Sequence, residues 1–112
     1  MTVMEYIREG RPATDFRRYS GSSRPWPNHI PRITCTDGFD VSVQAGELLY
    51  ATPRDDLGPW THVEVGFPSE RPEPWEAWAE YVEDADKPTG TVYSYVPVEM
   101  VEALIALHGG EL

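Results

Sequence analysis

The side chains of this sequence best suited to chemistry lie around a histidine and a glutamate in its middle. His62 and Glu64 alternate within an apolar stretch, so a strand would carry both on one face. Asp55 precedes them in a proline-rich loop. Imidazole and carboxylate groups bind zinc or transfer protons, but zinc generally takes three or four protein ligands. A small enzyme or a metal- or ligand-binding domain around His62 and Glu64, with Asp55 and Tyr93 or Tyr95, is therefore the alternative function.

The single cysteine does not predict a nucleophile. Cys35 alternates in phase with Ile33, which is typical of a small buried apolar side chain. A triad of Cys35 with His62 and an acid has no local sequence signature here. No glycine-rich phosphate loop is found, and Gly109-Gly110 follows a predicted helix instead of preceding one. We therefore expect no catalytic residue, no metal and no cofactor, and a chain that is not an enzyme.

Charge divides the chain into a basic and an acidic part. Residues 1–32 contain six arginines and three acids, a balance of +3. Residues 33–112 contain sixteen acids and three cations, a balance of −13, and the two parts sum to −10. Uneven charge indicates partners and solubility rather than fold. The sequence thus predicts an irregular leader rich in arginine, proline and serine at residues 1–32, and an acidic domain at residues 33–112.

The acids are concentrated around a helix predicted at residues 74–83. Trp75 and Trp78 would face the core, and carboxylates would face away from it. A row of carboxylates is usually a solvated face, but it can also imitate a phosphate backbone and occupy a basic surface of another protein. The predicted partner is a protein with a basic surface. The residues expected to bind it are Glu73, Glu76, Glu80, Glu83, Asp84 and Asp86.

Length and composition restrict the remaining function classes. A chain of 112 residues has room for one domain. One cysteine allows no intramolecular disulfide, which favours a reducing, cytoplasmic location. No apolar run approaches the ~20 residues of a membrane-spanning helix, so we expect no membrane partner. The net charge of −10 argues against direct binding of duplex DNA by the acidic domain. A structural protein that oligomerises through aromatic side chains is a third possibility.

Alternation of apolar and polar residues predicts five short strands, at residues 33–35, 39–43, 47–52, 60–67 and 91–96. A three-residue loop at residues 36–38 would pair Ile33 with Val41 and keep the apolar side chains on one face. Gly38 would take the left-handed position of that loop. Helices are predicted at residues 74–83 and 97–108, and a short starting element at residues 4–7.

The predicted order of elements after the leader is β-β-β-β-α-β-α. Short and closely spaced strands favour an α+β architecture, a small antiparallel sheet of about five strands with two helices packed on one face. The helix between the fourth and fifth strands leaves one parallel crossover as the alternative.

Three stretches are distinctive when taken together: DGFDVSVQAG at residues 37–46, GPWTHVEVGFPS at 58–69 and TVYSYVPVEMVEALIALHGG at 91–110. They resemble a family of small proteins of unknown function encoded by bacteriophages and prophages, particularly those of actinobacteria. The resemblance implies an accessory protein in the infected bacterial cytoplasm and assigns no site residue. By analogy, we expect binding to a host protein of a defence or nucleic-acid-handling complex.

Overall fold

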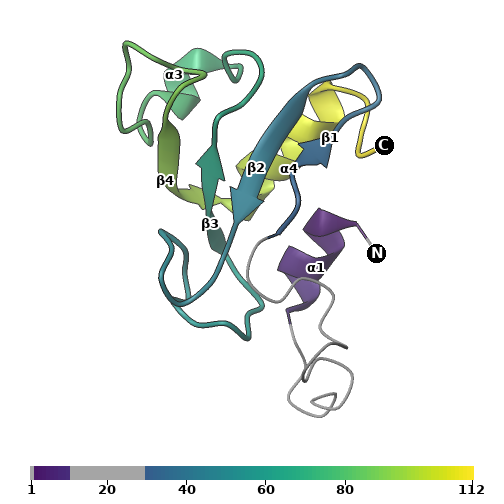
Figure 1. The fold of residues 1–112 in the computed structure, drawn as a ribbon, viewed down its shortest axis with the longest axis vertical. Helices are drawn as coiled ribbons and strands as arrows, with labels where there is room; N and C mark the ends of the chain where they lie inside the picture. The colour runs from purple at the N-terminus through teal and green to yellow at the C-terminus, as the bar shows by residue number, and fades with distance from the viewer. Residues whose placement is uncertain (1, 11–29) are drawn as a thin grey trace.

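The computed structural model describes residues 2–10 and 30–112. Its centre is a four-stranded antiparallel sheet in which each strand pairs with the next along the chain (Figure 1). The strands are β1 (Ile33–Thr34), β2 (Asp40–Gln44), β3 (His62–Gly66) and β4 (Val92–Pro97). The predicted α+β architecture is confirmed. The alternative parallel crossover is wrong, because β4 runs antiparallel to β3.

A helix, α1 (Val3–Glu9), occupies the start of the chain. Thr2 and Glu5 begin it with a capping box: the Thr2 hydroxyl accepts a hydrogen bond from the Glu5 N–H at 3.1 Å, and the Glu5 carboxylate accepts one from the Thr2 N–H at 3.3 Å. The predicted starting element is therefore confirmed, and an irregular course for residues 3–9 is wrong. The remainder of the predicted leader, residues 11–29, lies outside the described residues. The buried side chains of α1 are Val3, Met4, Tyr6 and Ile7.

The hairpin of β1 and β2 has the predicted three-residue loop. Ile33 pairs with Val41, and the N–H of Cys35 donates to the carbonyl oxygen of Phe39 at 2.7 Å. Gly38 has a φ of 95°, which a residue without Cβ adopts with little strain. Ile33, Cys35, Phe39 and Val41 are all buried, so the register predicted from the apolar pattern is confirmed.

The third predicted strand, at residues 47–52, is a loop. The N–H of Leu49 donates to the carbonyl oxygen of Gly46 at 3.3 Å, which closes a turn where a strand was expected. The Leu48 side chain is 87% exposed, so Leu48 and Leu49 do not form the buried face of a strand. Within this segment Thr52 forms an isolated bridge with His62. The prediction of a strand here is wrong, and the described sheet has four strands instead of five.

The strands predicted at residues 60–67 and 91–96 are confirmed as β3 and β4. Val63 and Val65 of β3 are buried in the core, together with Tyr93 and Val96 of β4. Trp60, just before β3, is 2% exposed, and its ring centroid lies 5.6 Å from that of Tyr6, so α1 joins the same core.

The helix predicted at residues 74–83 is much shorter in the structure. It is a single turn, α3 (Trp75–Trp78), and the chain beyond it pairs with β4. Val82 forms a bridge with Tyr93, and the N–H of Glu83 donates to the carbonyl oxygen of Val92 at 3.0 Å. Pairing with the sheet satisfies backbone groups that a longer helix would have satisfied internally. The helix prediction is therefore wrong beyond Trp78.

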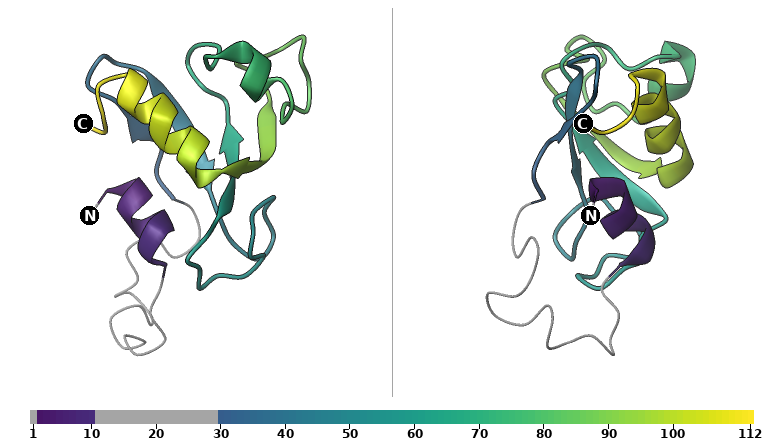
Figure 2. Two further views of the ribbon diagram at one scale, coloured as in Figure 1. Left: turned by 180° about the vertical axis from the view of Figure 1, so that it is seen from behind. Right: turned by 90° about the vertical axis from the view of Figure 1, so that its right-hand side faces the viewer.

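The last helix, α4 (Val98–Leu107), confirms the second helix prediction. It follows Pro97 and ends at His108, and Gly109 and Gly110 after it both have a φ of 91°. Figure 2 shows α4 lying across one side of the sheet, with α3 and α1 on that same side. No helix in the described ranges has the length and apolar character needed to cross a bilayer. The buried residues of α4 are the predicted Val98, Val101, Leu104 and Ile105.

Hydrogen bonds join the last residues of the chain to α1 and to β1. The two carboxylate oxygens of Glu111 accept bonds from the N–H groups of Val3 at 3.0 Å and Met4 at 3.1 Å. The N–H of Leu112 donates to the carbonyl oxygen of Thr34 in β1 at 2.8 Å. A carboxylate at a helix N-terminus is favourable because the first N–H groups lack partners within the helix. The C-terminal tail therefore fastens α1 to the body of the protein.

Candidate protein-binding surface

The carboxylates predicted to bind a partner lie in what we term the acidic segment, residues 73–86, which contains α3 and ends before β4. All six are exposed: Glu73, Glu76, Glu80, Glu83, Asp84 and Asp86. They do not form one helical row, because α3 ends at Trp78. The six residues are exposed as predicted, but they lie on one turn of helix and on the chain that follows it and pairs with β4.

Glu73 is the member of this set that is held by a cation. Both Nε and Nη2 of Arg71 donate to its Oε1, at 3.1 and 2.8 Å. Its other oxygen accepts a bond from the N–H of Trp75 at 3.0 Å, at the first turn of α3. The hydrogen bonds from Arg71 are the main reason that the pKa of Glu73 is lowered. The Arg71 guanidinium also lies 5.3 Å from the ring centroid of Trp75. Glu73 is therefore a structural residue at the start of α3.

The other carboxylates of the segment have no cation partner within the described ranges. Glu83 accepts a bond from the Ser94 hydroxyl at 2.7 Å, and Asp84 accepts one from the N–H of Asp86 at 3.0 Å. Over residues 2–10 and 30–112, the carboxylates of Glu76, Glu80 and Asp86 make no hydrogen bond and no ion pair. Most of the negative charge of the acidic segment is therefore not neutralised by the described residues and is exposed to solvent.

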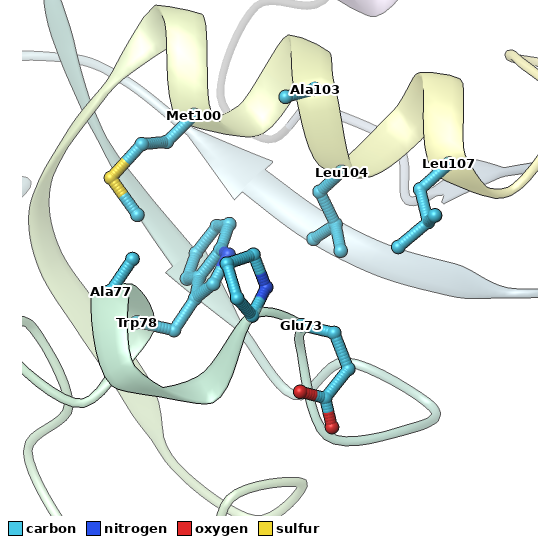
Figure 3. Close-up of a pocket in the computed structure, with 8 residues that line it drawn as sticks. Glu73, Ala77, Trp78, Met100, Ala103, Leu104 and Leu107 are labelled. Carbon is cyan, nitrogen blue, oxygen red and sulfur yellow. The ribbon is translucent and has the colours of Figure 1, made fainter.

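An apolar groove of about 300 Å³ lies beside the acidic segment, between α3 and α4 (Figure 3). Figure 3 shows Met100 and Leu104 of α4 extending toward α3, and the Trp78 side chain extending from α3 toward α4. Leu107 at the far end of the groove is 62% exposed. The lining residues are Glu73, Pro74, Ala77, Trp78, Met100, Ala103, Leu104 and Leu107.

The tryptophans of α3 belong to the core rather than to a free surface. Trp78 is 1% exposed, and its ring meets that of Tyr93 edge to face at a centroid distance of 5.6 Å. Trp75 meets the same ring at 6.4 Å. The hydroxyl of Tyr93 donates to the carbonyl oxygen of Pro88 at 2.6 Å, which ties the chain beyond the acidic segment to β4.

The alternative site around His62 is only partly assembled. The Glu64 carboxylate accepts a bond from the N–H of Tyr50 at 3.3 Å, and the ring centroids of Tyr50 and Tyr95 are 5.8 Å apart. Nδ1 of His62 lies 2.9 Å from the Thr61 hydroxyl. Across the part of the chain that the structure describes, no three histidine, cysteine or acidic side chains converge as metal ligands.

Two residues of that alternative are placed elsewhere. The Asp55 carboxylate accepts bonds from the N–H groups of Leu57 at 3.0 Å and Gly58 at 2.9 Å, so it closes its own loop. Tyr93 is fully buried on the core side of the sheet, and burial raises its pKa to about 12, although the charge of Arg71 opposes the shift. Neither joins His62 and Glu64.

Cys35 is buried, as its phase in the strand predicts. Burial is the main reason that the pKa of its thiol is raised, and the nearby charges of Asp37 and Glu111 raise it further. A raised pKa disfavours the thiolate, which is the reactive form. The arrangement does not suit a nucleophile.

The sequence prediction missed the apolar groove. Its signal was present in α4, where Met100, Ala103, Leu104 and Leu107 repeat at positions i, i+3, i+4 and i+7, beside the stripe predicted to be buried. When a helix is apolar on two adjoining stripes, the sheet covers one stripe and another element must cover the second. The shortness of α3 leaves the second stripe partly open.

The chain was also compared with known proteins. No model of a protein family matches its sequence, and neither a curated protein nor a solved structure is significantly similar to it.

Proposed function

We propose that this chain is a non-catalytic binding protein whose acidic segment docks on the basic surface of a host protein that handles nucleic acid. The observation that carries the proposal is that Glu76, Glu80 and Asp86 stand in solvent without a cation among the described residues. Like charges held close together repel one another by a few tenths of a kcal/mol per pair, and a basic partner relieves that repulsion.

The fixed backbone of the acidic segment supports the same function. Its helical turn is held by Glu73, and the chain after that turn is paired with β4 through Val82 and Glu83. Carboxylates presented on a backbone that is already ordered lose less conformational entropy on binding than carboxylates on a free chain. The resemblance to phage-encoded proteins supplies the proposed setting, the cytoplasm of an infected bacterium.

Capture from an actinobacterial lysate tests this function. The protein is immobilised and exposed to lysate at about 50 mM and about 500 mM salt, since exposed charges are screened at the higher concentration. A specific partner is expected at low salt, and added DNA should release it if both occupy one basic surface. A captured protein that DNA does not displace, or no captured protein, contradicts the proposal.

A matched pair of variants separates the acidic segment from total charge. Glu76→Lys with Glu80→Lys should abolish capture. Glu9→Lys with Glu47→Lys changes the net charge equally, since each substitution adds two positive charges, but it alters exposed positions outside the segment. The second variant should retain most of the capture. Equal loss in the two variants would show that net charge acts alone.

A further inference from the structure

We propose that the groove between α3 and α4 binds a basic amphipathic helix of the partner protein. This inference rests on the proposed function and names the partner's binding element. The groove is lined by apolar side chains, apart from the Glu73 carboxylate at its rim, which Figure 3 shows pointing away from α4. A groove of this kind takes apolar side chains, and the acids around it select their neighbours.

The α4 wall determines the length and spacing of the bound element. Met100, Ala103, Leu104 and Leu107 form a stripe that runs over eight residues and spans about 10 Å, or two helical turns. Such a stripe packs against a helix that carries its own apolar residues at i, i+3 or i+4, and i+7. The small side chains of Ala77 and Ala103 leave room for the close approach of that helix.

A helix fits this groove better than an extended strand. The α4 wall is a ten-residue helix whose backbone groups are hydrogen-bonded within it except at its ends. In the single turn of α3, the N–H groups of Ala77 and Trp78 donate to the carbonyl oxygen of Pro74, and the groove between the two elements is lined mainly by apolar side chains. An extended segment would bury N–H and C=O groups without partners there, whereas a helix satisfies its own. An added strand could not pair with β4 on this side of the described sheet, because residues 81–83 already pair with that strand.

Charge around the groove requires lysine or arginine on the flanks of the bound helix. Glu76 lies in α3 and Glu80 follows it, and Glu99 lies in the first turn of α4 with its side chain 71% exposed. Among the described residues, Arg71 is paired with Glu73, and Arg8 is paired with Glu102 at 2.6 Å and also lies 3.8 Å from Glu99. Glu76 and Glu80 are the members of this set without a cation, and they carry the preference for a basic helix. A second copy of this chain is disfavoured as the occupant, because each copy carries a net charge of −10.

Three designed peptides of about 16 residues test the inference, a length at which helix formation in water is feasible. The first is amphipathic, with leucines on one face and lysines on the other. The second has the same composition in scrambled order, and the third has glutamates in place of the lysines. Binding is measured by fluorescence anisotropy, and the amide NMR spectrum of the protein reports where each peptide contacts it. The first peptide should bind about tenfold more tightly than either of the others.

Two substitutions in α4 provide the matched control. Ala103→Gln places a longer side chain in the groove, and Ala106→Gln makes the same change at an exposed position outside it. Glutamine is a good helix former, so both variants should fold, which circular dichroism verifies. Ala103→Gln is expected to weaken binding of the first peptide about tenfold, and Ala106→Gln less than about twofold. Leu107→Ala, which removes an exposed apolar contact, should weaken it as well.

Failure of this inference is distinct from failure of the proposed function. If both lysine peptides bind equally and Ala103→Gln changes nothing, while Glu76→Lys with Glu80→Lys weakens both, the groove is not the site and the acidic segment still is. Binding by neither lysine peptide overturns the helix proposal, and the lysate experiment then decides the function separately. Equal binding of the glutamate peptide overturns the role of charge. A wild-type dimer that Ala103→Gln dissociates would identify a second copy as the occupant and overturn the proposal.

Discussion

Replacing Tyr93 with phenylalanine should destabilise the protein at neutral pH. The hydroxyl of this fully buried residue donates to the carbonyl oxygen of Pro88 at 2.6 Å. Tyr93→Phe removes the donor and leaves that carbonyl without its partner, which should lower the free energy of unfolding by about 1 kcal/mol. The edge-to-face packing of the ring on Trp75 and Trp78 is retained, so the loss reports the hydroxyl alone.

At alkaline pH the Tyr93→Phe variant should become more stable than the wild-type protein. Burial raises the pKa of Tyr93 from 10.0 to about 12. Because the folded pKa lies above the unfolded one, the linked stability is complete below pH 10 and is lost as the pH rises toward 12. A rise of this size in the pKa predicts a loss of about 1 kcal/mol at about pH 11, and about 2 kcal/mol at about pH 12. Tyr93→Phe has no such proton to lose, so the two stability curves should cross at about pH 11.

Urea unfolding followed by tryptophan fluorescence measures this crossing between about pH 8 and about pH 11.5. The other tyrosines are the same in both proteins, so the difference between the curves isolates Tyr93. Tyr50→Phe removes a hydroxyl from a side chain that is 42% exposed, and it is the control for the loss of a tyrosine outside the core. Parallel curves for Tyr93→Phe and wild type would refute the link between burial of the hydroxyl and stability.

Three further substitutions test local features of the fold, with urea unfolding as the measurement. Glu111→Gln should cost about 1 kcal/mol, because the charged cap on the first turn of α1 is lost, and hydrogen exchange should quicken first in that helix. Hydrogen bonds from the N–H of Phe39 and from His108 lower the pKa of Asp37 below its ordinary 3.8, so its contribution is present above that pH and is lost as the pH falls through the lowered pKa. Asp37→Asn should therefore lose less stability than wild type on acidification; an unchanged acid dependence would contradict the role of that carboxylate. Gly38→Ala should cost about 1 kcal/mol or more because its φ is 95°, whereas Gly90→Ala, where no positive φ is required, should be nearly neutral.

Local patterns in the sequence were sufficient for the hairpin and for α4. The loop at residues 36–38 follows from the phase of Ile33 and Val41 with Gly38 between them, and all three are close in sequence. In the same way, α4 is bounded by Pro97 and Gly109, and one face of its helical period is buried. Predictions that depend on residues within one or two turns of each other succeeded because the decisive interactions are local.

The failed predictions depend on partners distant in sequence. Residues 74–83 have the period of an amphipathic helix, but pairing of Val82 with Tyr93 and of Glu83 with Val92 competes with that helix, and periodicity contains no information on this competition. Residues 47–52 alternate like a strand but pair with the sheet only through Thr52. For the candidate surface, exposure of the six acids was predictable, whereas the groove was not, because it depends on how far α3 extends along α4.

The way in which α1 is attached determines where unfolding of the protein begins. A helix of seven residues is unstable alone in water, so α1 exists because Tyr6 packs on Trp60 and Glu111 caps its first turn. These contacts link residues separated by 54 and by more than 100 positions in the chain, and such contacts form late during folding. Partial unfolding should release α1 while the hairpin and α4 stay in place, and the Trp60 ring would then be the first part of the core that proteases and chaperones meet.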